Sequence, residues 1–138
     1  MIPDVTHVTV LVDDQYEALP FYTETLGFEI REDIGTGDDP RWVTVAPAGA
    51  AFPQIALIEA GTARERVRVG TQAADHTVLV LRTEDCQQAY ERLRNRGVTF
   101  RDKPAEKPWG TEATLEDPSG NVLGLFEPKT VIGGSNAG

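Results

Sequence analysis

Apolar and polar residues alternate over several short stretches of the chain, a pattern typical of half-buried β-strands. Residues 5–12, which read Val-Thr-His-Val-Thr-Val-Leu-Val, are also rich in β-branched side chains. The same reasoning predicts strands at residues 28–34, 41–47 and 54–59 and, in the second half, at 76–82, 98–102, 111–116 and 122–127. Turn-rich segments at 35–40 and 47–49 separate the strands of the first half.

Two further segments place apolar residues at helical spacing. The first begins after Asp14, which with Glu17 has the spacing of a capping box, and it runs to Leu26. The second begins near Asp85 and places one apolar face on Cys86, Ala89, Tyr90 and Leu93. Gly27 and Gly97 follow the two segments, and glycine commonly ends a helix.

The order of these elements indicates a duplicated unit. Each half reads βαβββ, and 20 positions separate His7 from Gly27 while 21 separate His76 from Gly97. We therefore predict an α+β fold in which residues 1–128 form one domain. Its parts are module one at 1–60, a linker at 61–74 and module two at 75–128, and residues 129–138 form a flexible tail.

Side chains alternate across a strand, so His7 and Thr9 share one face of the first strand while Val8, Val10 and Val12 share the other. The valine face is expected to pack under the helix. The same count predicts a cleft lined by His7, Thr9, Gln54, Ala56, His76, Val78, Gly124 and Phe126. Its two small residues, Ala56 and Gly124, are expected to leave room for a ligand at the centre.

Composition narrows the classes of partner. The net charge of −9 argues against nucleic acid and anionic membranes, which attract basic surfaces. The apolar runs have strand length, so no membrane span is predicted. The sequence starts without a secretion signal and holds a single cysteine, Cys86, so the cytoplasm is the expected location.

Several motifs together resemble the vicinal oxygen chelate superfamily, which includes glyoxalase I, bleomycin-resistance proteins, fosfomycin-resistance proteins and extradiol dioxygenases. They are the two His-headed strands, Phe21-Tyr22 with Leu26-Gly27-Phe28, and Asp117-Pro118-Ser119-Gly120-Asn121. The resemblance covers residues 4–128. It implies a half-open, barrel-like mixed sheet with the helices outside, and a homodimer.

The resemblance also implies where a metal would bind. It places the ligand positions of metal-dependent relatives at His7, Ala56, His76 and Gly124. Both positions where those relatives carry carboxylates therefore hold residues without a metal-binding side chain. A divalent Zn, Ni, Mn or Fe ion on His7 and His76 would need a displaced third ligand, such as Gln54 or Glu112, because catalytic ions normally have three protein ligands.

Four other residues are considered for chemistry or ligand contact. Glu112 is either a general base in an apolar cleft or an exposed strand residue. Trp42 and Trp109 either stack on a flat ligand or pack in a core or interface. Cys86 lies on an apolar helix face, where a thiol is usually inert.

Three functions remain open at this point. The leading hypothesis is a protein that binds a small organic molecule, for sequestration or for chemistry that needs no metal. The second is a metal-dependent lyase or dioxygenase that uses His7, His76 and a displaced ligand. The third is a module that binds a partner protein through a sheet edge. The fold alone does not choose among them.

Overall fold

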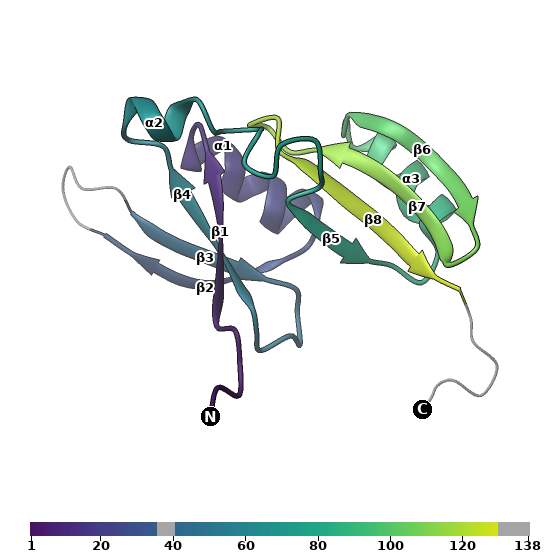
Figure 1. The fold of residues 1–138 in the computed structure, drawn as a ribbon, viewed down its shortest axis with the longest axis horizontal. Helices are drawn as coiled ribbons and strands as arrows, with labels where there is room; N and C mark the ends of the chain where they lie inside the picture. Colours follow the sequence, from purple (N-terminus) through teal and green to yellow (C-terminus); the bar gives the residue numbers. More distant parts are fainter. Residues whose placement is uncertain (36–40, 130–138) are drawn as a thin grey trace. The chain divides into compact units, whose positions relative to one another are not determined.

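A computed structural model describes residues 1–35 and 41–129 (Figure 1). The described residues form two compact units, one within Met1–Asp75 together with Asp117–Asn121 and the other within His76–Glu116 together with residues 122–129. Most of the predicted 35–40 turn and of the predicted tail lies outside the described residues. Each unit contains one four-stranded sheet, and the predicted α+β class with two βαβββ modules is confirmed.

The sheet of the first unit has the strand order β1-β4-β3-β2. The strands are β1 (His7–Val12), β2 (Glu29–Ile34), β3 (Trp42–Ala46) and β4 (Gln54–Glu59). β1 runs parallel to β4, and the other two pairs are antiparallel. All four strands lie where the alternation of apolar residues predicts them, with small shifts at the ends.

The helix of the first unit has two parts, α1 (Gln15–Pro20) and the π-helical η1 (Phe21–Thr25). Asp14 caps α1 as predicted, and its side chain accepts from the backbone N–H of Tyr16. Pro20 has no N–H to donate to the preceding turn, and the wider π turn follows directly after it. The sequence predicted a regular helix here, and the π turn adds one residue to it.

The linker between the modules holds a short helix, α2 (Ala63–Arg66). The side chain of Thr62 caps it by accepting from the backbone N–H of Glu65. Among the described residues, no helix is long and apolar enough to cross a membrane.

The sheet of the second unit has the equivalent order β5-β8-β7-β6. Its elements are β5 (Leu79–Arg82), α3 (Cys86–Asn95), β6 (Phe100–Lys107), β7 (Gly110–Glu116) and β8 (Val122–Pro128). Asp85 caps α3 by accepting from the backbone N–H of Gln88. Two predicted strands have other bounds: the strand expected at 76–82 begins only at Leu79, so His76 precedes it, and the strand expected at 98–102 runs from Phe100 to Lys107.

Both units bury the expected apolar faces. In the first, Val10 and Val12 of β1 are fully buried, together with Val43, Val45, Leu57 and Tyr22. In the second, Leu115, Leu123 and Leu125 are buried with Cys86 of α3. The predicted faces of β1 are therefore confirmed, because His7 and Thr9 on its opposite face are exposed.

The Asp-Pro-Ser-Gly-Asn motif forms a buried turn in the first unit. The Asp117 carboxylate accepts from the backbone N–H groups of Ser119 and Asn121, from the Asn121 side chain and from the Tyr22 hydroxyl. Gly120 has φ of 83°, a conformation that glycine adopts without strain. Asn121 also donates to the carbonyl of Leu11 at 2.9 Å. The motif is therefore hydrogen-bonded both to β1, through Leu11, and to the helix, through Tyr22.

Candidate functional site

The face of the first sheet that carries His7 holds five side chains that contact one another, one of which, Thr44, is fully buried. They come from all four strands: His7 from β1, Glu32 from β2, Trp42 and Thr44 from β3, and Gln54 from β4. We call these five residues the Glu32 cluster. Strand register brings them together, because His7 pairs with Gln54, Glu32 with Thr44, and Thr44 with Ala56.

Glu32 is the hydrogen-bonding centre of this cluster. Its Oε1 accepts from Trp42 Nε1 at 3.0 Å and contacts His7 Nε2 at 3.1 Å. The Thr44 hydroxyl lies 3.4 Å from the same oxygen and 2.7 Å from Gln54 Oε1. A hydroxyl carries one proton, so the shorter bond to Gln54 is the better one, and Glu32 depends mainly on Trp42 and His7.

These hydrogen bonds favour the ionised form of Glu32. The donor Trp42 and then the donor His7 hold the pKa of Glu32 below its ordinary value. The carboxylate is therefore charged at neutral pH. It is also solvent-accessible, with 36% of the side chain exposed.

The same bonds fix two aromatic rings on the open face. The rings of His7 and Trp42 have centroids 5.5 Å apart and are inclined at 59°. Trp42 is 37% exposed although its indole N–H is bonded to Glu32. An indole with a satisfied polar edge and an accessible ring suits contact with a flat, apolar ligand.

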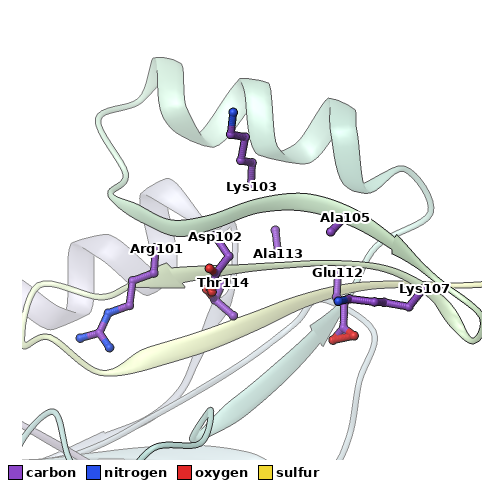
Figure 2. Close-up of a pocket in the computed structure, with 8 residues that line it drawn as sticks. All are labelled: Arg101, Asp102, Lys103, Ala105, Lys107, Glu112, Ala113 and Thr114. Carbon is purple, nitrogen blue, oxygen red and sulfur yellow. The ribbon is translucent and has the colours of Figure 1, made fainter.

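The second unit has a pocket over β6 and β7, shown in Figure 2, with a volume of about 590 Å³. We call it the β6–β7 pocket. Its polar lining comprises Asp102, Glu112 and Thr114 together with Arg101, Lys103 and Lys107. Thr114 donates to Asp102 at 2.6 Å, and Trp109 Nε1 donates to Glu112 at 2.9 Å.

The duplication is visible in these hydrogen bonds. Thr44 pairs with Ala56 in the first sheet, and Thr114 pairs with Gly124 in the second. Each threonine also contacts an acidic residue on the neighbouring strand, Glu32 in one case and Asp102 in the other. The two units therefore repeat one polar arrangement.

The register of β5 shows that His7 and His76 are not equivalent. His7 pairs with Gln54 two positions before Ala56, and in the second unit it is Val78 that bonds Val122, two positions before Gly124. His76 therefore lies two residues upstream of the matching position, in an exposed bend. The spacings of His7 to Gly27 and of His76 to Gly97 are nevertheless similar. The π turn adds one residue to the first helix, and this offsets part of the two-residue displacement of His76.

The space beside Gly124 is taken by neighbouring side chains. A Cβ at this position would lie 3.3 Å from Val80 and 3.6 Å from Thr77. Its counterpart Ala56 is 1% exposed. The small residues thus allow close packing within their own sheets, whereas the sequence suggested that they leave room for a ligand.

No group of three or more His, Cys, Asp or Glu side chains suited to a metal ion occurs in the described part of the chain. Ala56 and Gly124, where the resemblance places carboxylate ligands, offer no donor atoms. His7 and Glu32 form a pair of potential ligands, and their contact atoms lie 3.1 Å apart. The residues at the family positions do not fit a complete metal site.

Cys86 is buried at the start of α3, and its thiol lies 3.8 Å from the carbonyl of Leu125. Burial raises the pKa of this thiol, and the nearby carboxylates of Glu127, Asp85 and Glu112 raise it further. The thiol therefore stays protonated and unreactive at neutral pH, as its place on an apolar helix face predicted.

The structure thus brings His7, Trp42 and Gln54 together in one cluster, with Thr9 on the same face of β1. Trp109 and Glu112 form a separate pair in the second unit. Glu32 is the functional candidate that the sequence did not reveal. Its only signal was an acidic residue in a strand whose faces could not be assigned.

Comparisons with known proteins agree with this fold. The family model described as "Glyoxalase/Bleomycin resistance protein/Dioxygenase superfamily" matches residues 4–125. An uncharacterised protein from Shewanella frigidimarina is 33% identical over 128 residues, which is 92% of this chain and 95% of that protein.

Solved structures give the same result with closer matches. The crystal structure of UcmS2 is 38% identical, has a TM-score of 0.81 and is matched over 92% of this chain and 99% of that chain. TnmS3, described as an antibiotic binding protein from Streptomyces sp. CB03234, is 36% identical with a TM-score of 0.75, over 93% and 98% of the two chains. A fosfomycin resistance protein from Listeria monocytogenes, solved with Mn(II), is 17% identical with a TM-score of 0.66 and shows the fold alone.

Proposed function

This chain belongs to the Glyoxalase/Bleomycin resistance protein/Dioxygenase superfamily, and we propose that it binds a small organic molecule of the antibiotic class without using a metal. Binding of this kind sequesters the molecule and leaves it chemically unchanged. Support comes from TnmS3, a relative described as an antibiotic binding protein. It also comes from Ala56 and Gly124, which supply no metal-ligating atoms.

The observation that carries the proposal is the arrangement of Trp42. The Glu32 carboxylate satisfies its indole N–H, so the ring is held in place while its surface remains accessible. A ring fixed before binding loses little conformational entropy when a ligand stacks on it. His7, Thr9 and Gln54 then supply the polar contacts around the ligand. Separately, within the second unit, His76, Trp109 and Phe126 remain proposed ligand contacts.

Tryptophan fluorescence tests the proposal directly, because the chain has two tryptophans. The protein is titrated with a panel of aromatic antibiotics, in parallel with Trp42→Phe and Trp109→Phe. We expect saturable quenching that Trp42→Phe removes along with most of the affinity. Mass spectrometry of the released ligand should show it unmodified. The absence of saturable binding across the panel would refute the proposal.

One observation favours a second function, a metal-dependent lyase or dioxygenase. His7 Nε2 and Glu32 Oε1 are 3.1 Å apart, a separation that two ligands of one ion can have. A Zn, Ni, Mn or Fe ion would then be held by His7, Glu32 and a third donor such as Gln54. Elemental analysis after dialysis tests for this ion. About one ion per chain in the wild type, absent from His7→Ala, would favour the metal-dependent function over metal-free binding.

We also propose a homodimer in the cytoplasm. β2 lies at an edge of its sheet and exposes Ile30 and Ile34, and edges with exposed apolar residues are commonly covered by a second chain. Light scattering should give twice the monomer mass of 15.1 kDa. A monomeric mass would refute the dimer, and stable capture of another protein at β2 would favour the interaction-module hypothesis.

A further inference from the structure

Among the described residues, the contacts to the Glu32 carboxylate all fall on one of its two oxygens. Oε1 receives the contacts from Trp42, His7 and Thr44. Within residues 1–35 and 41–129, no donor contacts Oε2. A charged oxygen without a donor among the described residues can accept a hydrogen bond from a ligand, and the other oxygen of the same carboxylate is bonded to the indole of the accessible Trp42.

The arginines on the neighbouring strand segments do not neutralise this carboxylate. Arg31 contacts Glu29 at 3.6 Å and donates to the carbonyl of Pro47 at 2.9 Å. Arg41 pairs with Asp33 at 3.1 Å. In the described part of the chain, no arginine or lysine pairs with Glu32, and the His7 ring is its one basic contact. The net charge of −9 makes the electrostatic potential around this carboxylate more negative.

We propose that the ligand of the Glu32 cluster is an aromatic organic cation, whose positively charged N–H group donates to Glu32 Oε2 while its ring lies on Trp42. This inference rests on the proposed binding function and specifies the class of ligand. A charged N–H donor gives the carboxylate a charge-assisted hydrogen bond. The indole ring adds a cation–π attraction.

The same geometry disfavours ligands with a negative charge. A carboxylate or phosphonate placed on Trp42 would lie next to the ionised Glu32, and Arg31 and Arg41, which pair with Glu29 and Asp33, would not offset the repulsion. Neutral aromatic molecules keep the stacking contact and lose only the ionic one. The expected order of affinity is therefore cation, then neutral molecule, then anion.

Three acridines test this order because they share one ring system. The probes are aminoacridine, acridine and acridine carboxylate, with the substituent on the central ring opposite the ring nitrogen. At a mildly alkaline pH the first is a cation whose charge is shared between the ring nitrogen and the amino group, the second is neutral and the third is an anion. Isothermal titration calorimetry gives each affinity. We expect the cation to bind about tenfold or more tightly than acridine, since hydrogen bonds to charged groups are the stronger class.

The decisive variant is Glu32→Gln, which keeps an oxygen to accept from Trp42 and removes the charge. We expect its affinity for aminoacridine to fall about tenfold, to the level of acridine, while acridine binding stays unchanged. Asp33→Asn is the matched control. It removes the same charge from the adjacent residue, which pairs with Arg41 on the opposite face of β2, and should leave all three affinities unchanged.

The outcomes separate this inference from the function on which it rests. Binding of all three acridines with equal affinity, or tightest binding of the carboxylate, overturns the inference and leaves small-molecule binding standing. An equal loss in Glu32→Gln and Asp33→Asn also overturns it, because the effect would then be one of overall charge. If none of the acridines binds and Trp42→Phe leaves the fluorescence titration with the antibiotic panel unchanged, both the inference and the proposed function fail. Circular dichroism confirms that each variant is folded.

Discussion

Replacing Tyr22 with phenylalanine removes one buried hydrogen bond and little else. The Tyr22 hydroxyl donates to Asp117 Oδ2 at 2.9 Å, and the two residues are 0% and 4% exposed. The ring itself would keep its edge contact with Phe21 at 5.2 Å and its contact with Phe28 at 6.2 Å. The change therefore isolates the bond between the helix and the Asp-Pro-Ser-Gly-Asn turn.

The magnitude follows from what Asp117 retains. Three other donors remain on the carboxylate, from Ser119 and Asn121, so the charge does not become unpaired. The loss is one charge-assisted hydrogen bond, about 2 kcal/mol of the free energy of unfolding. For a chain of this length that corresponds to a decrease of about 5–10 °C in the melting temperature.

Urea denaturation followed by circular dichroism measures this difference, with Tyr16→Phe as the control because Tyr16 is 78% exposed. Burial first, and then Asp117, raises the pKa of Tyr22 above its ordinary value of 10.0. Folding thus favours the neutral phenol, so its contribution is complete below that value and is lost as pH rises above it. The destabilisation by Tyr22→Phe should shrink at alkaline pH. A difference no larger than that of Tyr16→Phe would refute the reasoning.

Three further predictions concern other sites. Glu32 has a lowered pKa, so its contribution to stability is present above the ordinary value of 4.5 and is lost as pH falls through the folded-state value. The melting temperature of the wild type should therefore fall more steeply with decreasing pH than that of Glu32→Gln, and a parallel dependence on pH would count against this. Cys86 should react with a thiol reagent only after unfolding, and stoichiometric labelling of the native protein would show that it is accessible. Gly124→Leu must displace Val80 and should destabilise the fold by about 1–3 kcal/mol in urea denaturation, whereas an unchanged midpoint would mean that the space is open after all.

Sequence patterns predicted the fold well where the physics is local. The alternation of β1 assigned Val10 and Val12 to the core and His7 to the open face, because only one face of a half-buried strand is apolar. The two helix starts at Asp14 and Asp85 followed from capping chemistry, which depends on residues only two or three positions apart.

The candidate site was less predictable because it depends on strand pairing. The β2–β3 register shifts between Ile30 and Glu32, and such a bulge changes which face the following residues occupy. Sequence alternation alone therefore could not place Glu32 beside Trp42 and His7. A bulge depends on contacts between strands and leaves no regular pattern along one of them.

The histidine comparison failed for a related reason. Spacing measured between His76 and Gly97 assumes that both helices have the same length, whereas the π turn after Pro20 adds a residue in the first module only. Pro20 was visible in the sequence as a residue without an N–H, but it did not reveal which kind of turn would follow. The ladder position of Val78 corrected the alignment.

The most direct test of the central claim, that the Glu32 cluster binds the ligand, is the indole region of a ¹⁵N NMR spectrum. The two tryptophans give two indole N–H signals, which Trp42→Phe and Trp109→Phe assign. Because the Trp42 indole N–H is bonded to Glu32, a ligand at this cluster must change its surroundings. The account predicts that adding aminoacridine shifts the Trp42 signal in a saturable way and to a greater extent than that of Trp109. A saturating shift of Trp109 with Trp42 unmoved would contradict it.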